Sequence, residues 1–200
     1  RESVMALLDA DVESLTVSLL HSYANPVHEK RLKALIGELD ANIPISLSSE
    51  ILPEFREYER TLVTVMNAYV GPSMRRYLSN FEEKLSAIDF APHVNIVRSD
   101  GGLMSVQRAS ESPVHTMLSG PAGGVSGAAL FSSLAGHPDA LGFDMGGTST
   151  DVAHYAGSYE RAFDTEVAGV RIRAPMMRIH TVAAGGGSIL HYEAGRFQVG

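Results

Sequence analysis

One short run, Leu141–Val152, constrains the fold most because it joins two strand-like segments through a pair of glycines. An apolar segment ends at Asp144, Gly146 and Gly147 turn the chain, and Asp151 opens the returning segment. Glycine permits backbone conformations that other residues avoid, and its N–H can face an anion with no side chain in the way. The run therefore predicts a phosphate-binding loop that contains Gly146 and Gly147.

The residues around the two glycines extend this prediction. The hydroxyls of Thr148, Ser149 and Thr150 supply neutral donors. Asp144 and Asp151 would repel a bare phosphate, so we expect a divalent cation between them and the ligand. Mg²⁺ keeps several waters and joins carboxylates to phosphates, which predicts a Mg²⁺ site held largely through water. An ordinary hairpin is the alternative, but the whole D-x-G-G-T-x-x-D pattern favours phosphate binding.

This run resembles the phosphate loops of the actin, sugar-kinase and heat-shock-chaperone superfamily of ATPases. Within that superfamily the chain is most similar to the hydantoinase A and 5-oxoprolinase family, and the similarity covers nearly its whole length. It rests on a series of segments that stand in the family's order. Besides the loop, these segments are Leu20–Tyr23 with Pro26 and His28-Glu29, Leu47–Glu50, Arg98–Leu103, Ser119–Val125 and Thr181–Ser188.

The fold expected from the pattern is an α/β layer architecture, because strand-like and helix-like segments alternate. The resemblance implies a partial actin-like ATPase (ribonuclease H-like) fold, with the end of the first half and the start of the second. Residues 1–118 would belong to the first half. Residues 119–200 would hold a crossing helix, the second phosphate loop and the start of the second half. The first phosphate loop would lie upstream of Arg1 and the adenosine site beyond Gly200, as in an excised piece of a larger protein.

Apolar spacing predicts the individual elements. The expected helices are His28–Leu39, Glu54–Ile88 and Ala122–Leu134. The expected strands are Val12–Leu20, Ile43–Leu47, Val94–Val97, Val152–Tyr155, Tyr159–Phe163 and Val170–Ile172, the last three as an antiparallel meander. Pro72 is expected to kink the long helix or to start a new one. The small residues of Ala122–Leu134 indicate close packing, and the resemblance implies that two halves of an ATPase pass beside this helix.

A second glycine-rich segment contains Gly185, Gly186 and Gly187. Three successive glycines either let the backbone approach a ligand or form a tight bend. The resemblance favours a place in the site, so these glycines are predicted to bind the cofactor.

Other polar residues give weaker indications. His180 and His191 bracket the glycine run and are candidates for ligand or substrate contact, although the sequence contains no H-E-x-x-H metal pair. Asp100, at the end of a predicted strand, either reaches the active cleft or caps a turn.

Composition excludes several classes of function. The net charge of −7 argues against a nucleic-acid partner, and the lack of cysteine excludes disulfides and thiolate chemistry. No apolar run reaches membrane-spanning length and no signal peptide is evident, so a cytoplasmic location is expected.

The resemblance implies ATP-driven opening of a cyclic amide, such as a hydantoin or 5-oxoproline, with ATP and Mg²⁺ as cofactors. Gly146, Gly147, Thr148 and Ser149 would hold the phosphates, while Asp144 and Asp151 would orient the Mg²⁺ shell or an attacking group. A hydantoinase B-type subunit or fused domain is the implied partner. Two alternatives stay open: an acetone or acetophenone carboxylase subunit of the same family, and a nucleotide-operated switch without substrate chemistry.

Overall fold

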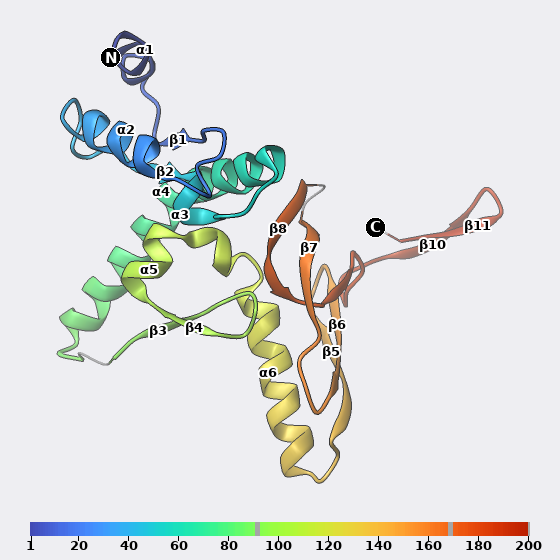
Figure 1. Ribbon diagram of the computed structural model, residues 1–200. Coiled ribbons are helices and arrows are strands. Elements are labelled where there is room, and N and C mark those ends of the chain that lie inside the picture. Colours follow the sequence, from blue (N-terminus) through green and yellow to red (C-terminus); the bar gives the residue numbers. More distant parts are fainter. Residues whose placement is uncertain (91–92, 168–169, 200) are drawn as a thin grey trace. The chain divides into compact units, whose positions relative to one another are not determined.

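The computed structural model describes residues 1–90, 93–167 and 170–199 as a mixed α/β structure (Figure 1). The chain divides into two compact units. Unit 1 contains residues 1–96, 103–117 and 163–174, and unit 2 contains residues 97–102, 118–162 and 175–200. Both units are therefore assembled from segments that are separate in the sequence. We expected the boundary between two ATPase halves to lie between residues 118 and 119, and this stays a prediction.

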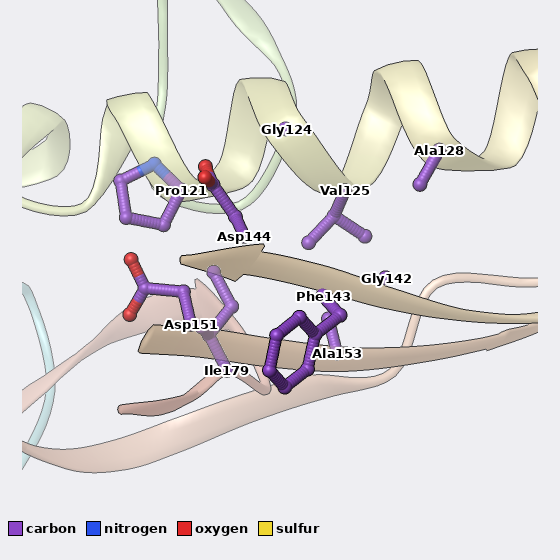
Figure 2. A pocket seen from close by; sticks show the side chains of 10 residues that line it. All are labelled: Pro121, Gly124, Val125, Ala128, Gly142, Phe143, Asp144, Asp151, Ala153 and Ile179. Atoms are coloured by element: carbon purple, nitrogen blue, oxygen red, sulfur yellow. The ribbon is translucent and has the colours of Figure 1, made fainter. Parts of the chain in front are cut away.

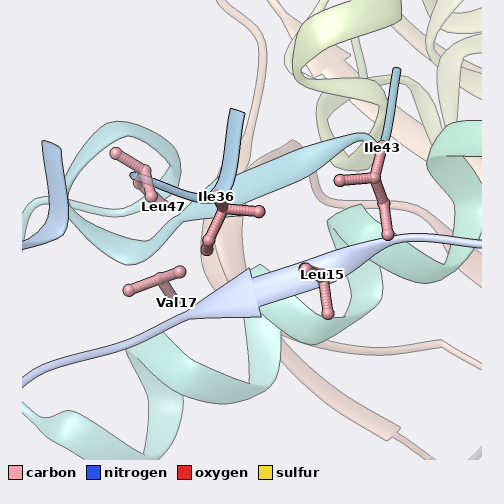
Figure 3. Packing of buried hydrophobic residues seen from close by; sticks show 5 residues of the cluster. All are labelled: Leu15, Val17, Ile36, Ile43 and Leu47. Carbon is pink, nitrogen blue, oxygen red and sulfur yellow. The ribbon is translucent and has the colours of Figure 1, made fainter. Parts of the chain in front are cut away.

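Unit 1 is built on a β–α–β arrangement. Strand β1 (Leu15–Val17) pairs in parallel with β2 (Ile45–Leu47), and helix α2 (Val27–Gly37) connects them. The apolar core of this arrangement contains the side chains shown in Figure 3, which are Leu15, Val17, Ile36, Ile43 and Leu47. The two strands and the helix were predicted, although each strand is shorter than its apolar run.

A buried carboxylate joins the ends of these two strands. Glu29, in the first turn of α2, is fully buried. Its Oε1 accepts from the N–H of Leu19 at 2.8 Å and from the hydroxyl of Ser48 at 2.6 Å, while its Oε2 accepts from the N–H of Ser49 at 2.9 Å. Two segments that carried the family resemblance therefore meet at Glu29.

Helix α4 (Glu57–Ala87) is the longest element, as predicted, and it continues through Pro72. Of the two outcomes expected at Pro72, a new helix start is therefore excluded. Proline has no N–H and leaves the carbonyl four residues earlier, that of Ala68, without its helical donor. Ser14 supplies the replacement, because its hydroxyl donates to the Ala68 carbonyl at 2.9 Å. The helix begins later than expected because Arg56 adopts a positive φ of 82°.

Several short elements of the first 117 residues were not predicted. They are α1 (Glu2–Leu8), α3 (Ser48–Ile51), β4 (Leu103–Ser105), α5 (Val106–Glu111) and the 3₁₀ helix η1 (Pro113–Thr116). Strand β4 pairs with β3 (Asn95–Val97), which was expected. The turn between them closes through the N–H of Arg98, which donates to the carbonyl of Gly102 at 2.8 Å.

Unit 2 contains helix α6 (Ser119–Leu134) and a three-stranded sheet. The sheet has the order β5-β6-β9, from β5 (Asp139–Met145), β6 (Thr150–Ala156) and β9 (His180–Val182), all antiparallel. Ala122, Val125, Ala153 and Met177 form an apolar cluster between the helix and the sheet. The strand pair β5–β6 and the helix were both expected from the sequence.

The predicted meander is wrong in its pairing. Strands β7 (Arg161–Val167) and β8 (Val170–Met177) pair with each other. Among the described residues, β6 and the segment before β7 are joined by an isolated bridge from Tyr155 to Tyr159. Strand β9 takes the free edge of β6 instead. A final hairpin, β10 (Leu190–Glu193) with β11 (Arg196–Val199), turns at Ala194 and Gly195, which both have positive φ.

Candidate functional site

The predicted phosphate loop connects β5 to β6 in a strict register. Asp144 stands directly opposite Asp151, and Met145 stands opposite Thr150. Between them the N–H of Gly146 donates to the carbonyl of Ser149 at 2.9 Å and closes the turn. The side chains of directly opposed residues project from the same face of a sheet, so the register brings the two carboxylates to one face.

That face forms a pocket of about 210 Å³ with helix α6 (Figure 2). The aspartates lie at one end of the pocket, and their carboxyl groups reach the same end of the two strands. The other lining residues are small or apolar: Pro121, Gly124, Val125, Ala128, Gly142, Phe143, Ala153 and Ile179. The pocket therefore combines an apolar wall with two acids beside the loop.

Helix α6 lies against β5 at two glycines. A Cβ on Gly124 would lie 3.8 Å from Oδ2 of Asp144, and a Cβ on Gly142 would lie 3.5 Å from the Cβ of Ala128, both ordinary contact distances. Gly123 and Gly127 differ, because a Cβ there would meet nothing within 4 Å. The face of α6 that carries Gly124 and Ala128 is therefore the one that packs on β5, with room for a methyl group but not for a large side chain.

The loop glycines do not use unusual backbone conformations. Neither Gly146 nor Gly147 has a positive φ. A Cβ on Gly147 would meet nothing within 4 Å, and the residue is exposed. Gly147 therefore leaves open space beside its backbone. The backbone conformation that only glycine adopts easily, which we expected at these two residues, is not found.

The loop presents three consecutive backbone donors. Within the described ranges, no acceptor is found for the N–H groups of Gly147, Thr148 and Ser149. The hydroxyls of Thr148 and Ser149 make no hydrogen bond to the described part of the chain either. Successive peptide N–H groups in a turn are a common way for proteins to bind anions.

The second glycine-rich segment packs directly on the loop. The N–H of Gly186 donates to the carbonyl of Gly146 at 2.9 Å, and the N–H of Gly187 donates to the carbonyl of Gly147 at 2.8 Å. A Cβ on Gly185 would lie 2.5 Å from the Gly146 carbonyl oxygen, so no side chain fits there. The two glycine-rich segments are thus brought together, although two of the three predicted ligand-binding N–H groups face the loop.

Two threonines complete the arrangement in ways that the sequence did not indicate. Thr150, expected as a ligand donor, is buried and donates its hydroxyl to the carbonyl of Ala184 at 2.7 Å. Thr181 donates its hydroxyl to Oδ1 of Asp151 at 2.6 Å. Both contacts follow from the pairing of β6 with β9, which places Thr150 opposite Val182 and Asp151 opposite Thr181.

The weaker candidates have structural partners or lie outside the pocket. Oδ1 of Asp100 accepts from the N–H of Gly102 at 3.0 Å, and Oδ2 pairs with Arg98 at 2.7 Å. Asp100 therefore caps its turn. His191 lies 3.0 Å from Gln198 in the β10–β11 hairpin, and the exposed His180 does not line the pocket.

The aspartate pair suits a hydrated cation better than a metal cage. No group of three or more His, Cys, Asp or Glu side chains with metal-binding geometry occurs among residues 1–90, 93–167 and 170–199. Mg²⁺ is commonly held by one or two carboxylates, substrate phosphates and waters. Two opposed carboxylates beside free N–H donors fit that requirement.

Comparison with known proteins places the chain in a family. Residues 60–200 match the family model described as hydantoinase/oxoprolinase, and residues 1–39 match the model of the N-terminal region of the same family. The chain therefore belongs to the hydantoinase/oxoprolinase family. It is 44% identical over 196 residues to 5-oxoprolinase 1 of Arabidopsis thaliana, covering 97% of this chain and 15% of that protein.

Two further relatives have solved structures. Caprolactamase subunit alpha of Pseudomonas jessenii is 31% identical over 194 residues, covering 96% of this chain and 28% of the subunit. The crystal structure of ATP-dependent caprolactamase from that organism has a TM-score of 0.82 at 29% identity, covering 96% of this chain and 29% of that one. A nucleotide-free acetone carboxylase also has a TM-score of 0.82, at 28% identity, covering 100% of this chain and 29% of that one.

None of the helices within residues 1–90, 93–167 and 170–199 is both long enough and apolar enough to cross a membrane.

Proposed function

We propose that this chain forms part of an ATP-dependent cyclic-amide hydrolase, in which the β5–β6 loop binds phosphate groups of the nucleotide. The observation that carries the proposal is the set of three consecutive N–H groups, at Gly147, Thr148 and Ser149, without an acceptor in the described ranges. They lie between two aspartates that line a pocket. The similarity to a 5-oxoprolinase and a caprolactamase supports the substrate class.

Each part of the site has a distinct role in this proposal. The N–H groups and the hydroxyls of Thr148 and Ser149 hold phosphate oxygens. Asp144 and Asp151 hold a hydrated Mg²⁺, which would neutralise charge on the phosphates. Phosphoryl transfer depends mainly on such positioning and charge stabilisation. Thr181 fixes one oxygen of Asp151 and so limits the orientations of that carboxylate.

The proposed architecture is that of an actin-like ATPase. The order of α6, β5, the loop and β6 supports this assignment, in which the loop is the second of two phosphate loops. The proposed partner is a second subunit or fused domain of the hydantoinase B type. The designation of the caprolactamase relative as a subunit alpha supports a multi-subunit assembly.

ATP hydrolysis by the intact protein, measured against a panel of second substrates, tests the proposal. We expect 5-oxoproline, hydantoin or caprolactam to stimulate release of phosphate together with the ring-opened product. Stimulation by acetone with bicarbonate would instead favour a carboxylase, the alternative supported by the equal TM-score of acetone carboxylase. Turnover that no substrate stimulates would indicate a nucleotide switch.

A further inference from the structure

The segment Ala184–Ser188, here called the glycine strap, contacts the phosphate loop through its backbone. Its Gly186 and Gly187 N–H groups donate to the carbonyls of Gly146 and Gly147. The strap is itself closed by a turn, in which the N–H of Ser188 donates to the carbonyl of Gly185 at 3.0 Å. The hydroxyl of Ser188 accepts from the N–H of Gly185 at the same distance.

These contacts determine the direction of two peptide groups in the loop. In a planar trans peptide the C=O and the following N–H point in opposite directions. With the carbonyls of Gly146 and Gly147 turned toward the strap, the N–H groups of Gly147 and Thr148 point away from it. Both donors therefore point to the same side of the loop.

The strap also takes a hydrogen-bonding group away from the hairpin. In a tight two-residue hairpin, the first and last residues exchange two hydrogen bonds. Here the N–H of Gly146 donates to the carbonyl of Ser149, but the carbonyl of Gly146 accepts from Gly186 instead. The N–H of Ser149 is consequently left as the third donor.

We infer that the glycine strap is the positioning element of the phosphate site. It turns the N–H groups of Gly147 and Thr148 to one side of the loop and leaves that of Ser149 as a further donor, and Gly185 makes this approach possible. The inference rests on the proposed function, since it assigns a role within that site. The strap acts through the loop carbonyls, with Gly186 and Gly187 as positioning residues. Thr150 anchors the strap by donating to the carbonyl of Ala184.

Two glycines offer a matched pair of variants. A Cβ on Gly185 would lie 2.5, 2.7 and 2.8 Å from backbone atoms of Gly146 and Gly147, so Gly185→Ala must push the strap off the loop. A Cβ on Gly123, in helix α6, would meet nothing within 4 Å, and Gly123 does not line the pocket. Neither glycine has a positive φ, so alanine introduces no backbone strain of its own at either position.

The test is the affinity of the intact protein for ATP with Mg²⁺ relative to its affinity for adenosine, measured by calorimetry. We expect Gly185→Ala to reduce this preference for ATP by about tenfold or more, as for the loss of a hydrogen bond to a charged group. Gly123→Ala should keep the wild-type preference. A merely structural role would weaken ATP and adenosine binding alike, and that result would overturn the inference.

A second pair of variants decides the matter if Gly185→Ala does not fold. Thr150→Val removes the anchor of the strap and should reduce the preference for ATP, whereas Thr150→Ser keeps a hydroxyl and should restore it. An unchanged preference in Thr150→Val would count against the strap. If the wild-type protein itself does not prefer ATP to adenosine, the proposed function fails, and the strap inference fails with it.

Discussion

At the scale of single residues, the aspartate pair carries an electrostatic cost. Like charges directly opposite each other on two strands destabilise a sheet. Asp144 and Asp151 occupy such positions, and only Asp151 receives a hydroxyl donor, from Thr181, within the described part of the chain. A cation bound between nucleotide and carboxylates would offset this repulsion, which agrees with the proposed Mg²⁺ site.

Asp144→Asn should slow ATP turnover by the intact protein. The expected loss of transition-state stabilisation is about 2–4 kcal/mol, as for other oriented groups at active sites. Because Asp144 is exposed, the melting temperature should change little. Asp139→Asn is the matched control, since Asp139 is exposed at the opposite end of β5, opposite Ala156. Equal turnover by both variants would reject the role of Asp144.

A second residue-scale prediction concerns Glu29 and acid. Burial raises the pKa of Glu29, but hydrogen bonds from Ser48, Ser49 and Leu19 outweigh burial and lower the pKa overall. A carboxyl whose folded pKa is lowered stabilises the protein at higher pH, and this stabilisation is lost as the pH falls through the folded value. The free energy of unfolding should therefore decrease as the pH falls below about 4.3, the ordinary pKa of glutamate.

Ser48→Ala removes one of the donors that lower this pKa. The stability loss in acid should therefore become smaller and should be complete at a higher pH, although it still begins near the ordinary pKa of glutamate. Urea unfolding at a series of pH values measures both effects. Lys33→Ala is a suitable control, because the ion pair of Lys33 with Glu50 is exposed to solvent. An unchanged pH profile for Ser48→Ala would show that Glu29 does not depend on this hydroxyl.

At the scale of elements, α6 makes its close approach to β5 on one face only. Gly123→Leu and Gly124→Leu should gain the same helix propensity, up to about 1 kcal/mol, relative to glycine. Gly124→Leu should in addition be destabilised by about 1–3 kcal/mol through overpacking against Asp144 and should bind ATP more weakly. Thermal unfolding and ATP titration of both variants provide the comparison. Identical behaviour would mean that the Gly124 face is not packed.

The hydrogen bond from Ser14 to Ala68 is expected to stabilise helix α4 where Pro72 interrupts its backbone hydrogen bonds. Ser14→Ala should leave the carbonyl of Ala68 without a donor and cost about 1–3 kcal/mol of stability. Pro72→Ala restores a backbone N–H four residues along the helix. The cost of Ser14→Ala should therefore be smaller in the Pro72→Ala background, as a double-mutant cycle by chemical unfolding would measure. Additive effects of the two changes would contradict this account.

The elements that the sequence predicted are those specified by local pattern. The loop run and α6 were found because glycines, acids and small residues stand close together in the chain. The long helix was predicted, but its course through Pro72 was left open, because the replacement donor is Ser14, 54 positions before Ala68. The contact of Thr181 with Asp151 was missed for the same reason, since it depends on which strand takes the edge of β6. Helices of four to seven residues, such as α3 and α1, are too short to show a period.

At the scale of the whole molecule, residues 163–174 return the chain to unit 1. They belong to unit 1, although residues 118–162, which precede them, belong to unit 2. Ile172 is fully buried, and Arg173 donates to Glu54 at 2.8 Å, which raises the pKa of its guanidinium. The stability of unit 1 therefore depends on a segment far along the chain.

If the chain is cut between residues 118 and 119 and both pieces are co-expressed, we expect them to remain associated, because the second piece carries residues 163–174. Size-exclusion chromatography of the affinity-purified pair measures this. Replacing Ile172 with Asp in the second piece should weaken the association, whereas the exposed Arg161→Ala should not. Pieces that separate completely at micromolar concentration would contradict the assignment of residues 163–174 to unit 1.

Because the segments of the two units alternate along the chain, they also determine which chimeras with other family members keep their packing intact. The chain changes unit at five junctions, after residues 96, 102, 117, 162 and 174. A chimera with a single crossover after residue 130, for instance, would combine residues from both parents inside both units and disturb packing in each. Exchange of one intact unit between family members requires all five junctions at once. The proposed phosphate site would therefore be transferred with its whole unit only by a designed graft of several segments.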